Sequence, residues 1–112
     1  MQGTSLTDLI DEHLGIARAT PSGRSSVTVY GGHEHALRQT LITLVAGRVL
    51  AEHESPAEAS LHVLAGRIRL NTGADSWEGG PGDFLVIPAD RHDVTATEDS
   101  ATLLTVANNL RG

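Results

Sequence analysis

The stretch Gly47–Gly66, GRVLAEHESPAEASLHVLAG, decides the fold that we predict for this chain. Residues 48–53 and 59–65 alternate apolar and polar side chains, which is typical of half-buried strands, and a Ser-Pro step separates them. The stretch therefore predicts two short strands joined by a tight polar turn, as in a hairpin. It also contains His53, His62 and three glutamates, the densest group of acid, base and ligand side chains in the sequence.

The strand pattern continues on both sides of this stretch. Short runs rich in Val, Ile, Leu and Thr recur between turns that contain Gly, Pro, Asn or Asp. They predict strands at residues 27–30, 36–46, 48–53, 59–65 and 67–71, a short one around Trp77, and strands at 84–87, 92–97 and 101–107. Ahead of them, apolar residues at helical spacing behind the capping box Ser5-Leu6-Thr7-Asp8 predict one helix over residues 6–18.

These elements predict an all-β fold with one N-terminal helix. Short strands at close spacing, with no helix between them, favour an antiparallel double-sheet jelly roll or barrel. We expect residues 1–23 to form the helix and a linker, and residues 24–112 to form a single β-barrel domain. The 112 residues include one Phe, one Trp and one Tyr, so the core of this domain must be aliphatic and thin.

Composition excludes several classes of function. The formal net charge of −6, with no cluster of basic residues, argues against nucleic acid as a partner. The chain has no cysteine, which excludes disulfides, thiolate zinc sites and cysteine nucleophiles. No segment resembles a signal peptide or reaches the length of a transmembrane helix. We therefore expect a cytoplasmic protein that contacts neither nucleic acid nor membrane.

Two frames of glycine and histidine carry a resemblance to a known family. The first runs from Gly47 through His53 to Gly66, and the second is GDFLVIPADRH at residues 82–92, with five residues between its Gly and its Pro. Both are similar to the two motifs of the cupin family, in its small, single-domain, RmlC-like form. The resemblance covers about residues 36–107 and implies a double-stranded β-helix, another description of a jelly-roll barrel. Cupins are commonly dimeric, so it also implies a homodimer, which would suit so thin a core.

The resemblance also implies where a metal site would lie. Metal-binding cupins hold a divalent metal with three histidines and one glutamate, leaving coordination positions open. His53 and His92 occupy two of these four positions, whereas Ser55 and Ala59 occupy the others. A serine hydroxyl is a poor ligand and alanine offers none, so the implied site is depleted. His53, Ser55 and His92 are the predicted pocket residues; His53 and His92 would be the ligands of any weakly held Fe, Mn, Ni or Zn.

Alternation assigns His62 to a different surface from this pocket. Side chains of a strand alternate with period two, so Ala59, Leu61 and Val63 share the face that we expect to line the barrel. His62 then lies on the outer face of the sheet or at a dimer contact.

The other histidines and the tryptophan have structural interpretations. His33 and His35 form a second His-x-His, but they follow two glycines, which predicts a loop with solvated side chains. The alternative for them is a place at the barrel mouth or at a subunit contact. His13 lies on the polar side of the predicted helix, so we expect it to be solvated, and Trp77 should be a packing or interface residue.

Three functions stay open at this point. The preferred hypothesis is a small cupin that binds a small molecule or a weakly held metal, as a sensor or accessory barrel. The second is a metal-dependent enzyme, an oxygenase, isomerase or decarboxylase, with a third ligand besides His53 and His92. The third is a structural or interaction dimer whose pocket is vestigial. The catalytic residues, ligand and metal are unknown from the sequence.

Overall fold

The computed structural model describes residues 1–53 and 58–107, with residues 52 and 53 described by their backbone. The helix α1 spans Leu6–Ala19, and the Ser5 hydroxyl caps it by accepting the N–H of Asp8 at 3.2 Å. The strands in the described part of the chain are β1 (Arg24–Gly31), β2 (Leu37–Leu44), β3 (Val49–His53), β4 (Glu58–Ala65), β5 (Ile68–Thr72), β6 (Ser76–Gly79), β7 (Phe84–Val86), β8 (His92–Ala96) and β9 (Ser100–Ala107). The predicted helix and strands are confirmed, with small differences at their ends.

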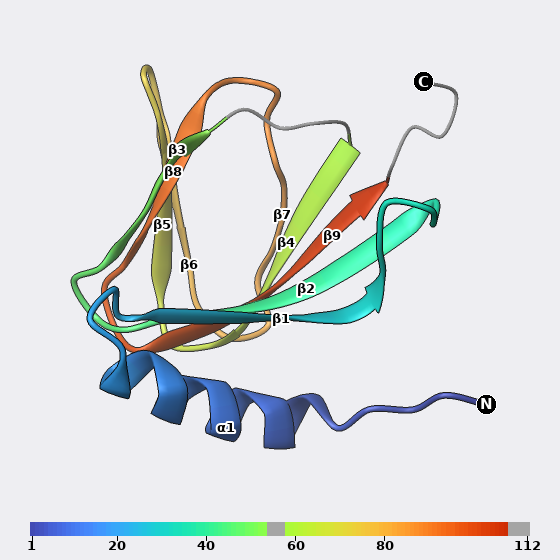
Figure 1. The fold of residues 1–112 in the computed structure, drawn as a ribbon. Coiled ribbons are helices and arrows are strands. Elements are labelled where there is room, and N and C mark those ends of the chain that lie inside the picture. The colour runs from blue at the N-terminus through green and yellow to red at the C-terminus, as the bar shows by residue number, and fades with distance from the viewer. Residues whose placement is uncertain (54–57, 108–112) are drawn as a thin grey trace.

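The strands form two antiparallel sheets. One sheet has the order β1-β2-β9-β4-β7 and the other has the order β3-β8-β5-β6. Figure 1 shows the two sheets facing each other, with α1 on the outside of the larger one. Alternate side chains of both sheets point inward and form an aliphatic core cluster of Leu61, Val63, Ile68, Leu70 and Val94. The predicted all-β jelly-roll barrel with one N-terminal helix is confirmed.

The strands predicted as a hairpin do not pair with each other. β3 pairs with β8 in the four-stranded sheet, whereas β4 lies between β9 and β7 in the five-stranded sheet. The predicted hairpin is therefore wrong, although both of its strands exist. Alternation reports that a segment is half-buried and extended, but it carries no information about the partner strand. In this fold the chain passes from one sheet to the other between these two strands.

The helix α1 packs on the outer face of the five-stranded sheet, chiefly against β1 and β2. His13 is half-buried there, and its Nδ1 lies 2.6 Å from the Ser25 hydroxyl of β1. The Thr43 hydroxyl donates to the carbonyl of His13 at 3.1 Å, from the neighbouring strand. The prediction of a solvated His13 is wrong, because this polar side of the helix faces polar groups of the sheet. No helix in the described ranges is long and apolar enough to cross a membrane.

Asp99 fixes the end of α1 to the barrel. Its carboxylate accepts the backbone N–H of Ala46 at 2.9 Å and the Nε–H of Arg18 at 2.9 Å. These two interactions, the backbone hydrogen bond first, lower the pKa of the Asp99 carboxyl below its ordinary value. A group whose pKa is lower in the folded state stabilises the fold above its unfolded pKa, and this contribution is lost as the pH falls through the folded pKa.

We expect Asp99→Asn to lower the melting temperature by a few degrees at pH 7, since it removes the charge that both donors favour. The difference from the wild type should shrink as the pH falls into the range where Asp99 itself becomes protonated. Thermal unfolding followed by circular dichroism across the acidic range would measure this. Glu98→Gln, a change at the exposed neighbouring carboxylate, is the control. A difference in melting temperature between Asp99→Asn and the wild type that stays constant with pH would contradict a stabilising role of the ionised Asp99 carboxylate.

Candidate functional site

A narrow cavity lies between the two sheets and is the centre of the candidate site. Its volume is about 30 Å³, close to the volume that one water molecule takes in the liquid. Most of its lining is aliphatic, and the complete set is Ile42, Leu44, Leu50, Leu61, Ile68, Ile87, His92, Val94, Ser100, Thr102 and Leu104. Sites for drug-sized ligands measure roughly 300–1,000 Å³. The space between the sheets therefore has room for a water molecule or an ion.

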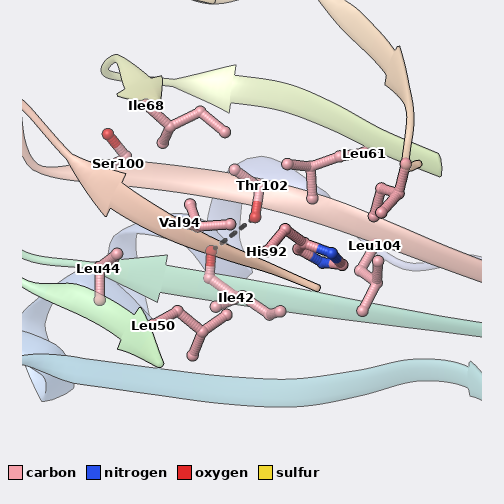
Figure 2. A pocket seen from close by; sticks show the side chains of 11 residues that line it. Ile42, Leu44, Leu50, Leu61, Ile68, His92, Val94, Ser100, Thr102 and Leu104 are labelled. Atoms are coloured by element: carbon pink, nitrogen blue, oxygen red, sulfur yellow. Dashed lines mark hydrogen bonds between the residues drawn. The ribbon is translucent and has the colours of Figure 1, made fainter. Parts of the chain in front are cut away.

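His92 places a polar ring in this apolar cavity. It is the first residue of β8, its side chain is 2% exposed, and Figure 2 shows its ring among the aliphatic side chains. Its Nδ1 lies 3.0 Å from the carbonyl oxygen of Asp90. Because a carbonyl oxygen only accepts, Nδ1 must carry the proton of this hydrogen bond, and in the neutral ring Nε2 is then the acceptor. The hydrogen bond from Nδ1 to the Asp90 carbonyl fixes the orientation of the ring, and it leaves Nε2 as the atom that could ligate a metal or bind a proton donor.

His53 lies opposite His92 in the backbone register. The two residues are Cα partners where β3 pairs with β8, after a register shift between Leu50 and His53. The folded backbone thus brings these two predicted site positions together at one end of the pair of strands. Of His53 only the backbone is described, and the predicted pocket residue Ser55 lies outside the described residues.

Ala59 faces the interior, as predicted. It is 8% exposed and alternates along β4 with Leu61 and Val63, which are also buried. The position at which the family motif has a glutamate therefore presents a methyl group. His62, on the opposite face of β4, is half-buried and lies opposite Phe84 of β7 in the register, which confirms its predicted place on the outer face of the sheet.

The described residues that line the cavity supply few groups that could ligate a metal. In the described part of the chain, no group of three or more His, Cys, Asp or Glu residues could hold a metal ion. The two hydroxyls in the cavity already have backbone partners. Ser100 Oγ accepts the N–H of Arg67 at 2.9 Å, and Thr102 Oγ1 lies 3.5 Å from the carbonyl of Ile42 (Figure 2). Among the described residues that line the cavity, His92 is thus the one strong metal ligand. His53, its partner in the backbone register, is the second predicted ligand position.

Sequence reasoning missed Ser100 and Thr102 as cavity residues. The signal for them was period-two alternation along β9, where they share a face with Leu104. Small polar side chains on an otherwise apolar strand face are easily assigned to the solvent side, because their hydrogen bonds to distant backbone groups are invisible in a sequence.

His33 and His35 lie in an exposed loop, and Trp77 is a packing residue, as predicted. Both histidines are exposed in the connection between β1 and β2, and the His35 ring meets Tyr30 edge-on with centroids 5.4 Å apart. Trp77 of β6 is half-buried and packs against the core cluster. Among these three side chains, none lines the cavity around His92.

Comparison with known proteins shows what the fold resembles. No protein-family model matches the chain, and no curated protein matches it in sequence. Among solved structures, an RmlC-like cupin protein from Desulfovibrio desulfuricans has a TM-score of 0.73 and 22% identity, covering 96% of both chains. A cupin superfamily protein from Desulfitobacterium hafniense has a TM-score of 0.69 and 16% identity, over 77% of this chain and 78% of that one. The DMSP lyase DddQ from Ruegeria pomeroyi has a TM-score of 0.66 and 23% identity, over 80% of this chain and 49% of that one.

Proposed function

We propose, since this chain has the cupin fold, that it is a cupin-type binding protein in which His53 and His92 together hold a divalent metal weakly or anchor a small molecule. The observation that carries the proposal is the His92 imidazole, buried in an apolar cavity with its Nδ1–H bound to the Asp90 carbonyl. Imidazole is the side chain that most often ligates metals in proteins, and the hydrogen bond to Asp90 holds this ring in one orientation. A metal ion or a small molecule bound in this cavity would therefore meet a polar group whose position is already fixed.

The register between β3 and β8 supports a shared site. Residues directly opposite each other in an antiparallel pair project to the same face, with Cβ atoms about 4.5–5.5 Å apart. Two imidazoles at that spacing can ligate one metal ion, with water filling the other positions. Affinity for such nitrogen ligands rises from Mn²⁺ and Fe²⁺ toward Ni²⁺, with Zn²⁺ also bound well. Among the four metals considered, Ni²⁺ and Zn²⁺ are therefore the ions that two histidines would hold best.

A metal-dependent enzyme is the second candidate, and the likeness to a DMSP lyase favours it. At 23% sequence identity, this likeness is one of fold. Catalysis of the usual cupin kind would need donors beyond His92 and His53, because Ala59 offers none at the glutamate position. The enzyme hypothesis therefore predicts a metal that is bound stoichiometrically and survives purification, whereas the binding hypothesis predicts a metal that dialysis removes.

We expect metal-free protein titrated with Ni²⁺ or Zn²⁺ in a calorimeter to bind about one ion, and His92→Ala to weaken this binding at least about tenfold. His92→Gln, which better preserves the volume of the side chain but lacks the imidazole, should weaken it similarly. His62→Ala, on the outer face of β4, is the matched control and should change the affinity less than about twofold. Unchanged binding in both folded His92 variants would contradict the proposal, and so would equal losses in the His62 and His92 variants.

The predicted homodimer belongs to the same proposal. A second copy would bury part of the apolar surface that this chain exposes, which includes Phe84 and Val86 of the edge strand β7 at 61% and 69% exposure. The cytoplasmic location stays a prediction from composition. An interaction dimer with a vestigial pocket would fold normally and keep all of its binding behaviour in the His92 variants, and the same titration tests the binding.

A further inference from the structure

A second groove opens between the edge strands of the two sheets. β1 is the edge of the five-stranded sheet and β3 is the edge of the four-stranded sheet. The groove has a volume of about 280 Å³ and contains both hydroxyl and guanidinium groups. Its polar lining includes Ser22, Arg24, Ser26 and Thr40, and its apolar lining is Ile42 and Leu50. Ile42 and Leu50 also line the His92 cavity, so they separate the two spaces.

The hydroxyls in this groove are available as donors. A fourth hydroxyl in the lining, that of Ser25, is occupied by the His13 ring at 2.6 Å. The hydroxyls of Ser22, Ser26 and Thr40 make no side-chain hydrogen bond within the described residues. Three O–H groups therefore face a space large enough for a small polyatomic ligand.

A second arginine, Arg48, lies close to the Ser22–Arg24 segment, although it does not itself line the groove. The side chain of Arg48 packs directly over Gly23, where an added Cβ would lie 2.6 Å from Arg48 Cγ and 2.8 Å from Nε. Gly23 has a φ of +69°, which favours glycine and leaves room for this approach. Gly23 lies between the groove residues Ser22 and Arg24 in the chain, so the Arg48 side chain is next to this end of the groove and outside its lining.

Within residues 1–53 and 58–107, neither of these two guanidinium groups has a recorded carboxylate partner. The ion pairs between described residues involve the arginines at positions 18, 67 and 69, and none includes Arg24 or Arg48. Asp99 is already held by Arg18 and by the N–H of Ala46. In a chain with a formal net charge of −6, Arg24 in the hydroxyl-lined groove and Arg48 next to it concentrate positive charge at this place, which favours an anion.

We propose that this groove binds the phosphoryl group of a small anionic molecule, or free phosphate. A tetrahedral oxyanion offers several acceptor oxygens, which match the three hydroxyl donors and the forked guanidinium groups of Arg24 and Arg48. The volume is close to the lower end of small-molecule sites, which suits a phosphate or a short phosphate ester. The site is built from β1, β2, β3 and the segments before β1 and β3, and it does not depend on the metal or ligand proposed for His92.

The test is a titration of the full chain with inorganic phosphate, glycerol 3-phosphate and acetate, at constant ionic strength in chloride. Amide chemical shifts in ¹⁵N-labelled protein would locate the binding, and we expect the largest changes at residues 22–26 and 48. Arg24→Gln and Arg48→Gln should each weaken phosphate binding at least about tenfold, as expected for the loss of a charged hydrogen bond. Arg69→Gln removes the same charge from β5 and should change the affinity less than about twofold.

Tighter binding of glycerol 3-phosphate than of phosphate would identify a phosphate ester as the ligand class, and equal binding would identify free phosphate. Acetate binding as strong as phosphate binding would overturn the proposal, because the groove would then have no preference for a tetrahedral anion. Equal losses in the Arg24, Arg48 and Arg69 variants would also overturn it, since they would indicate a general effect of net charge. So would the absence of shift changes at residues 22–26 and 48.

Discussion

Gly66→Ala is expected to lower the free energy of unfolding by about 2–5 kcal/mol, a large part of the total stability of a small domain. Gly66 lies between β4 and β5, where the chain leaves one sheet for the other, and its φ is +77°. A side chain in this left-handed region is strained. An added Cβ would also collide with the carbonyl oxygen of Asp99 and would lie 2.7 Å from the Cα of Ser100. Both atoms belong to the backbone, so neither can rotate away.

Urea unfolding followed by circular dichroism would measure this effect, with Gly73→Ala as the matched control. Gly73 lies in the turn between β5 and β6, its φ is not positive, and a Cβ there would meet nothing within 4 Å. We expect Gly73→Ala to change the stability by less than about 1 kcal/mol. A loss for Gly66→Ala as small as that expected for Gly73→Ala would show that the crowding at Gly66 is relieved by movement of the turn between β8 and β9.

The fold was predictable where local pattern and local structure coincide. Alternation along β4 identified the inward face of Ala59, Leu61 and Val63, and the Ser5 cap located the start of α1. The pairing of strands was not predictable in the same way. β3 and β4 are neighbours in the chain and belong to different sheets, because each finds its hydrogen-bond partner in a segment far away in sequence. The environment of His13 was misjudged for a related reason, since its polar partners lie on β1 and β2.

The candidate site was predictable in position and not in detail. The spacing of the second motif located His92 at the start of a strand, but its orientation depends on the carbonyl of Asp90, a backbone atom that every residue has. The anion groove left no signal of its own in the sequence. Residues 21–26, PSGRSS, are typical of a turn, and only the fold brings Arg48 over Gly23. Sites assembled from two sheet edges depend on tertiary structure for their recognition.

Leu61→Ala is expected to lower the free energy of unfolding by about 2–5 kcal/mol. Leu61 is 4% exposed, belongs to the core cluster and lines the cavity around His92. It lies in register with Leu85 on one side and Leu104 on the other, so the sheet holds the neighbouring backbones in place. The space that its side chain leaves would join the existing cavity, and the two sheets cannot close over it without disturbing their hydrogen bonds.

The control for Leu61 is Leu37→Ala, the same chemical change at a residue of β2 that is 40% exposed. It should cost less than about 1 kcal/mol in urea unfolding, because a half-solvated side chain loses fewer contacts. A loss below about 1 kcal/mol for Leu61→Ala as well would mean that the sheets do move together, and that the cavity is not held open by the packing of its walls. A large loss would instead show that the room around His92 is set by rigid aliphatic walls, so that a bound ion or water must fit a space that already exists.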